Sequence, residues 1–162
     1  DADLLLVIAG EGPASGPLKK EVARRHLQEH VLFVGYLDRR AALLDCYRAA
    51  DAFVFASRTE TQGLVLLEAM ALGLPVISTA VMGTRDIVGP GRGALVPEDD
   101  EADFASAMVR FVRDPAVRAR LAAEAVDWAR EWQADAMAAR LAQLYEAVAG
   151  ARPAPAAATA AA

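Results

Sequence analysis

Two glutamates, Glu60 and Glu68, stand eight positions apart in the otherwise largely apolar stretch TETQGLVLLEAMALGLPV. The residues from Leu64 to Leu72 predict a helix that is buried on all sides, where a carboxylate costs desolvation energy unless a polar group meets it. Glu68 is therefore expected to form a buried ion pair or a backbone hydrogen bond, or else to point into a ligand cleft.

The helix is expected to begin near Gly63, with Glu60 in the loop before it. A capping box between Ser57 and Glu60 is the alternative, but it would place Gly63 inside the helix at a cost of about 1 kcal/mol relative to alanine. With a rise of about 1.5 Å per residue, Glu68 lies about 7–8 Å along the axis from the helix start. The two carboxylates would then flank an N-terminus whose free N–H groups and dipole attract phosphate.

A carboxylate on each side of an anion-binding helix start suits a ligand with hydroxyl-bearing rings on both sides of a diphosphate. Ionised carboxylates accept strong hydrogen bonds from such hydroxyls, and Gly63 would let the ligand approach the backbone closely. Nucleotide sugars and nicotinamide dinucleotides both have this layout. The segment GEGPASG does not match the G-x-G-x-x-G spacing of dinucleotide-binding turns, which disfavours the second ligand class.

The elements that would position these residues alternate along the chain. Apolar runs without polar alternation predict parallel strands buried on both faces, and the helical patterns between them predict an α/β fold with a Rossmann-like, doubly wound parallel sheet. The chain enters directly on an apolar run, so the first strand of such a sheet is expected to be missing. The expected strands span 4–10, 31–35, 52–57, 74–79 and 93–97, and the expected helices span 17–28, 39–50, 64–72, 99–113, 114–131 and 134–148.

Composition limits the function classes. The 162 residues are 55% hydrophobic and carry a formal net charge of −5, which predicts a globular unit and excludes a broad cationic surface for nucleic acid. Residues 1–148 are expected to form one domain, with 99–148 as its C-terminal helices. The Ala/Pro-rich residues 149–162 are expected to be a disordered tail.

Single residues indicate the compartment and the absence of a metal. Cys46 is the one cysteine, so a disulfide within the chain is excluded and a cytoplasmic location is the default. Because Glu68 interrupts the longest apolar run, no membrane span of about 18 residues is expected. His26 and His30 are expected to face solvent, since no cluster with metal-ligand spacing surrounds them.

Several stretches resemble the C-terminal, donor-binding domain of retaining GT-B glycosyltransferases of family 4, also called glycosyl transferases group 1. The central stretch is similar to that family's pattern of Glu, seven residues, Glu, followed by Ala-Met-Ala-x-Gly-x-Pro-Val. The resemblance implies that the chain folds as one half of a GT-B protein. The stretches are LLLVIAGEGP, VLFVGYL, YRAADAFVFASRTETQGLVLLEAMALGLPVIST, GALV and YEAV.

The resemblance also implies a role for each candidate site residue. Glu60 would be the catalytic residue that faces the donor sugar, and Glu68 would bind the ribose hydroxyls. Gly10 and Gly12 match family glycines near the cleft, although they could simply form a turn, and Tyr36 could simply be a surface aromatic residue. Backbone N–H groups of Thr61, Gln62, Gly63, Leu64 and Val65 would face the diphosphate, and Gly35, Tyr36 and Leu37 would hold the nucleobase.

The implied partners are a nucleotide-sugar donor, a glycan or lipid-linked acceptor, and an N-terminal acceptor-binding domain, without cofactor or metal. The family's diphosphate-binding Arg and Lys have no counterpart here, so Arg58 and Arg85 are candidates either to assist or to remain on the surface. Gln62 replaces an aromatic residue of many members, and Met82-Gly83 replaces Gly-Gly. A peripheral location at the inner membrane is an option for the full-length protein.

Two alternatives to donor-dependent catalysis remain open. The chain by itself could be a nucleotide-binding module that catalyses no reaction. Glu60 could instead be a covalent nucleophile, as in retaining glycosidases, where two carboxylates flank one scissile bond. This second alternative is disfavoured because Glu60 and Glu68 are expected to contact opposite ends of a single donor.

Overall fold

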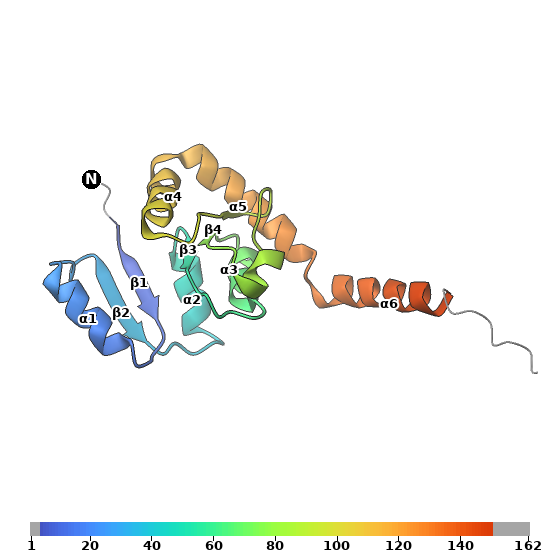
Figure 1. The fold of residues 1–162 in the computed structure, drawn as a ribbon, viewed down its shortest axis with the longest axis horizontal. Helices are drawn as coiled ribbons and strands as arrows, with labels where there is room; N and C mark the ends of the chain where they lie inside the picture. The colour runs from blue at the N-terminus through green and yellow to red at the C-terminus, as the bar shows by residue number, and fades with distance from the viewer. Residues whose placement is uncertain (1–3, 151–162) are drawn as a thin grey trace, which may run out of the picture.

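Strands and helices alternate along the chain, as the sequence predicts (Figure 1). The computed structural model describes residues 4–150. Its strands are β1 (Leu6–Ala9), β2 (Val31–Gly35), β3 (Phe53–Phe55), β4 (Val76–Ser78) and β5 (Ala94–Leu95). Its helices are α1 (Ser15–Arg24), α2 (Ala42–Ala49), α3 (Leu64–Ala71), the 3₁₀ helix η1 (Met82–Asp86), α4 (Glu101–Arg113), α5 (Pro115–Arg130) and α6 (Ala134–Gly150).

All strand pairs are parallel, which confirms the α/β class, but the strands pair in two groups. One sheet has the order β1-β2 and the other has the order β3-β4-β5. No strand of the first sheet pairs with a strand of the second among residues 4–150. We call β1, α1 and β2 the first lobe, and β3–β5 with α3, η1, α4 and α5 the second lobe.

The two lobes differ in burial, and this corrects one expectation. β4 is buried along its whole length, whereas most of β1 is exposed and no residue of β2 or α1 is fully buried. The apolar runs of β1 and β2 therefore do not mark strands buried on both faces. A two-stranded sheet with one helix has too few neighbours to enclose both of its faces.

The core lies in the second lobe, where α3 packs against α5 and β4. Leu66 and Met70 of α3 are fully buried, and Ala125 of α5 lies in the same apolar cluster. Trp128 of α5 donates from its indole N–H to the Ile87 carbonyl at 2.8 Å. The guanidinium of Arg92 lies over the Trp128 ring, 4.3 Å from the ring centroid. These contacts fix the segment after η1 against α5.

The C-terminal helices begin within two residues of their predicted starts, α4 at Glu101, α5 at Pro115 and α6 at Ala134. Asp114 caps α5 by accepting hydrogen bonds from the N–H groups of Ala116 and Val117, and Pro115 occupies the first turn, where its missing N–H is not needed. α6 projects away from the two lobes and has no buried residue (Figure 1). It continues through Ala149 and Gly150, which were expected to belong to the tail, and residues 151–162 lie outside the described range. None of the helices in residues 4–150 is long and apolar enough to cross a bilayer.

Candidate functional site

The loop between β3 and α3 ends at Gly63, which the structure makes the N-cap of α3. Gly63 has φ +68, a left-handed conformation that disfavours other residues. A Cβ atom at this position would also lie 2.7 Å from the Cδ1 atom of Ile87. The predicted helix start near Gly63 is therefore correct, and the left-handed backbone conformation favours glycine there, whereas the terminal methyl group of Ile87 would have to shift to admit a Cβ atom.

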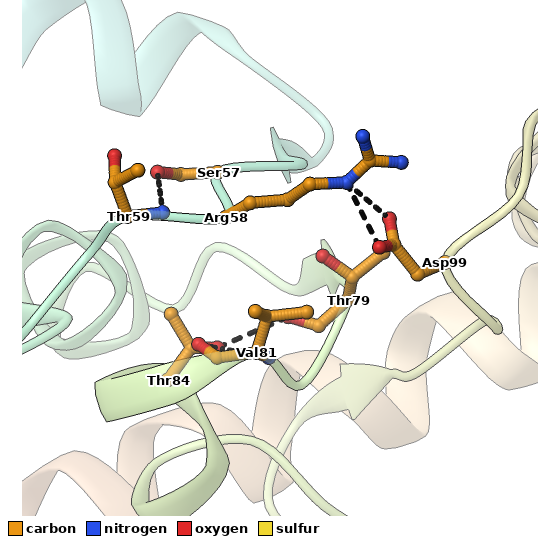
Figure 2. Close-up of polar contacts among 7 residues, drawn as sticks. All are labelled: Ser57, Arg58, Thr59, Thr79, Val81, Thr84 and Asp99. Atoms are coloured by element: carbon orange, nitrogen blue, oxygen red, sulfur yellow. Dashed lines mark hydrogen bonds and ion pairs between the residues drawn. The ribbon is translucent and has the colours of Figure 1, made fainter.

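The carboxylate of Glu60 turns back onto this helix start. Its Oε1 atom accepts hydrogen bonds from the backbone N–H groups of Gly63 at 2.9 Å and Gln62 at 3.0 Å. These two bonds, the Gly63 bond first, lower the pKa of Glu60 below its ordinary value. The capping box with Ser57 does not form, because the Ser57 hydroxyl accepts from the N–H of Thr59 instead (Figure 2).

Glu68 has a partner within the chain. Its Oε1 atom accepts a hydrogen bond from Nη2 of Arg39, which lies in the segment between β2 and α2. The side chain of Glu68 is 33% exposed, so it is partly buried. Of the alternatives predicted for Glu68, the structure shows the ion pair. The pair is only partly buried.

Tyr47 of α2 is the buried aromatic residue beside this ion pair. Its ring packs edge-on against Phe53 of β3, with ring centroids 5.5 Å apart. Burial raises the pKa of Tyr47, and the negative charge of Glu68 raises it further. The apolar contacts of Tyr47 thus connect α2 to β3 next to the Arg39–Glu68 pair.

The glycine and aromatic residues predicted to line the cleft gather at the carboxyl ends of β1 and β2. The N–H of Gly10 donates to the carbonyl of Gly35 at 2.7 Å, which joins the two loops that follow these strands. Tyr36 is 72% exposed, and Leu37 is partly buried. Gly12 is exposed with open space around it. Its place in the loop after β1 gives it no contact that distinguishes a binding residue from a turn residue.

The remaining predicted residues form the first turn of α3 and the loop before it. Thr61 and Gln62 are exposed, Leu64 is 54% exposed, and Val65 is partly buried. In an α-helix the first N–H groups have no acceptor within the helix. Because Glu60 takes the N–H groups of Gln62 and Gly63, the N–H groups of Leu64 and Val65 are the ones this turn can offer to a ligand.

Helix η1 holds the Glu60 loop in place, a contribution that sequence reasoning missed. The N–H of Gly83 donates to the Glu60 carbonyl at 3.1 Å, and a Cβ atom on Gly83 would collide with the Thr61 backbone. The fully buried Thr84 accepts from the N–H of Val81 at 2.9 Å (Figure 2). The departure from Gly-Gly at 82–83 was the one available signal. Met82 indeed adopts φ +53, a conformation that glycine favours.

The two candidate cations are both engaged at the carboxyl end of the second sheet. Arg58 pairs through Nε with Asp99, at 2.8 Å from Oδ2, and this pairing raises the pKa of Arg58 (Figure 2). Arg85 donates from Nε to the carbonyl of Ala80 at 2.9 Å. The charge of Arg58 is therefore largely balanced by Asp99. Both His26 and His30 are exposed, and no group of three or more potential metal ligands occurs among residues 4–150.

Parallel strands, loops at their carboxyl ends and a glycine-led helix start are the features of a Rossmann-like α/β fold. Residues 1–128 match the family model described as glycosyl transferases group 1. The chain therefore belongs to this glycosyltransferase family, and its fold is one half of the GT-B arrangement.

Individual relatives support the same assignment. The chain is 47% identical over 104 residues to a D-inositol 3-phosphate glycosyltransferase of Streptosporangium roseum. This match covers 64% of the chain and 24% of that relative. A sucrose-phosphate synthase from Thermosynechococcus elongatus has 30% identity and a TM-score of 0.69, covering 93% of this chain and 39% of that one. HepE of Anabaena, solved in complex with UDP, has 21% identity and a TM-score of 0.71. The match covers 91% of this chain and 41% of HepE. The chain thus spans about a quarter of the length of the Streptosporangium roseum relative.

Proposed function

We propose that this chain is the donor-binding domain of a retaining glycosyltransferase and that it binds a nucleoside diphosphate sugar. The observation that carries the proposal is the start of α3, where Gly63 opens the helix between the carboxylates of Glu60 and Glu68. The first turn offers N–H groups to the diphosphate, and each carboxylate has one oxygen outside the hydrogen bonds described above. Family membership supports this assignment.

The ligand would extend across three segments. The diphosphate would face Leu64 and Val65, the ribose hydroxyls would donate to Glu68, and the base would lie along Tyr36 and Leu37. The Arg39–Glu68 pair supports this path, because it brings the segment after β2 to α3. The complex of HepE with UDP is a precedent for a nucleoside diphosphate in a protein of this fold.

In the reaction, the bond between the sugar C1 atom and the diphosphate oxygen would break, an acceptor hydroxyl oxygen would form the new bond to C1 on the same face, and the proton of that hydroxyl would pass to the departing diphosphate. The negative charge that develops on the diphosphate would be stabilised by the N-terminus of α3, without a metal ion. The second oxygen of Glu60 would accept hydrogen bonds from the sugar hydroxyls. The acceptor, either a glycan or lipid-linked, would be held by an N-terminal domain of the full-length protein.

Calorimetric titration of the chain with UDP, GDP and ADP tests this proposal. We expect one of the three to bind and Glu68→Gln to weaken that binding about tenfold, since one charged hydrogen bond contributes about 1.5 kcal/mol or more. Glu29→Gln is the matched control, because Glu29 is exposed and lies outside the proposed site. Absence of binding by all three nucleotides would refute the proposal.

A nucleotide-binding module without catalysis is the second candidate. It is favoured by the partners of the two candidate cations, because Arg58 pairs with Asp99 and Arg85 donates to the Ala80 carbonyl. An assay of donor hydrolysis with UDP-glucose, GDP-mannose and ADP-glucose separates the two candidates. Turnover by the chain that Glu60→Gln abolishes would exclude the module, whereas binding without any turnover would favour it.

A further inference from the structure

Arg39 connects two parts of the molecule that the sheets leave separate. It follows β2 and the exposed Tyr36, in the segment that leads away from the first lobe, and its Nη2 atom donates to Glu68 on α3 of the second lobe. No other ion pair among residues 4–150 joins residues 4–41 to the second lobe. The Glu68 carboxylate is therefore tied by a hydrogen bond to the segment that carries Tyr36 and Leu37.

The contact uses only part of the carboxylate. The guanidinium approaches through one nitrogen onto Oε1, not through the two parallel bonds of a bidentate pair. An ionised carboxylate has about four lone-pair positions. Oε2 of Glu68, which has no hydrogen-bond partner among residues 4–150, can therefore accept hydroxyl donors while Arg39 remains in place.

The surroundings favour a fixed carboxylate over a mobile one. Tyr47 is only 6% exposed and lies beside both charges, with its ring held against Phe53. The body of Glu68 belongs to a helix whose neighbours Leu66, Ala69 and Met70 are fully buried. With the backbone and one carboxylate oxygen both held, little rotamer freedom remains to be lost when a ligand binds.

We infer that Arg39 is a positioning residue that holds the carboxylate of Glu68 so that Oε2 receives the ribose hydroxyls of the bound nucleotide. Arg39 itself contacts neither the ribose nor the phosphates. The inference rests on the proposed function and assigns a residue to it that the Glu-x7-Glu pattern does not contain. The competing possibility is that Arg39 blocks Glu68 until the ligand displaces it.

The test measures the affinity of the tightest binder among UDP, GDP and ADP together with its 2′,3′-dideoxy analogue. We expect Arg39→Ala to weaken binding of the full nucleotide about fivefold, the upper range for a partly exposed ion pair, and to change binding of the dideoxy analogue by less than about twofold. Arg40→Ala is the matched control, since Arg40 is the exposed neighbour, and its backbone N–H, not its side chain, donates to the Asp38 carboxylate. It should leave both affinities unchanged.

Three results would overturn the inference. Tighter binding by Arg39→Ala would mean that Arg39 blocks Glu68, and an equal loss for both nucleotides would mean that Arg39 acts through phosphate charge or through the fold. No loss for either nucleotide would remove Arg39 from the site. In all three cases the wild-type chain still binds the nucleotide, so the proposed function stands. Failure of the wild-type chain to bind UDP, GDP and ADP refutes the proposed function and the inference with it. Far-UV circular dichroism of each variant verifies that it is folded.

Discussion

At the scale of single residues, the two glutamates are held before any ligand arrives, and by different partners. Glu60 is fixed by backbone N–H groups within three residues of itself, whereas Glu68 is fixed by Arg39, 29 residues away in the chain. A local hydrogen bond of the first kind can be anticipated from spacing. The second depends on how α3 meets the segment after β2, and no spacing rule indicates it.

The pKa of Glu60 gives a pH-dependent prediction. Because hydrogen bonds lower this pKa in the folded chain, the charged form stabilises the fold above its ordinary value of 4.5, and the contribution is lost as pH falls through the lowered pKa. Glu60→Gln keeps an acceptor but removes the charge. Urea unfolding should show the variant less stable than wild type at pH 7, with a smaller gap in unfolding free energy at pH 3. A gap that stays constant between these pH values would show that the charge of Glu60 does not matter.

At the scale of elements, η1 determines the shape of the loop that precedes α3. Gly83 presses so closely on Thr61 that any side chain at position 83 must displace one of the two backbones. Thr84 holds the other side of η1, with its hydroxyl bonded within the 79–84 turn. The geometry of the first turn of α3 therefore depends on a segment about twenty positions further along the chain.

Gly83→Ala tests this dependence. We expect a loss of about 1–3 kcal/mol in unfolding free energy, since an inserted methyl group in a closely packed site forces a backbone shift. Urea unfolding at pH 7 measures it. Gly16→Ala is the matched control, because a Cβ at Gly16 in α1 meets nothing within 4 Å. If both substitutions had the same effect, close approach of η1 to Thr61 would not be what constrains position 83.

Particular elements show where sequence reasoning succeeds and where it stops. The start of α3 at Gly63 and the break at Asp114–Pro115 follow from local rules for glycine and proline, and both are correct. The prediction that β1 is buried on both faces was wrong. An apolar run shows only that the strand's own side chains are apolar, and it does not show which neighbours are available to cover them. The Arg39–Glu68 pair and the η1 contacts are long-range, so the sequence contains no periodic signal for them.

At the scale of the whole molecule, stability is unevenly distributed. The described residues of β1, α1 and β2 include none that is buried, while α3, β4 and α5 supply most of the core. Apolar surface removed from water is the main source of folding free energy, so local opening should cost far less in the first lobe.

Hydrogen exchange followed by mass spectrometry on the full chain tests this. Amides of β1, α1 and β2 should exchange at least about tenfold faster than those of α3 and β4, which corresponds to a difference in opening free energy of about 1.4 kcal/mol or more. Peptides from α5 are the internal reference for the protected part. Equal protection across both lobes would show that the first lobe is stabilised by contacts beyond its own burial.

Both tryptophans of the chain, Trp128 and Trp132, stand at the end of α5, with their rings 6.0 Å apart. Their emission therefore records the environment of the second lobe alone, through the Ile87 carbonyl and the Arg92 guanidinium that touch Trp128. Tryptophan fluorescence would not change if β1 and β2 separated or if the loop at Tyr36 rearranged. Following the first lobe by tryptophan fluorescence requires a tryptophan near it, and Tyr36, whose ring is exposed in the loop after β2, is the position at which to introduce one.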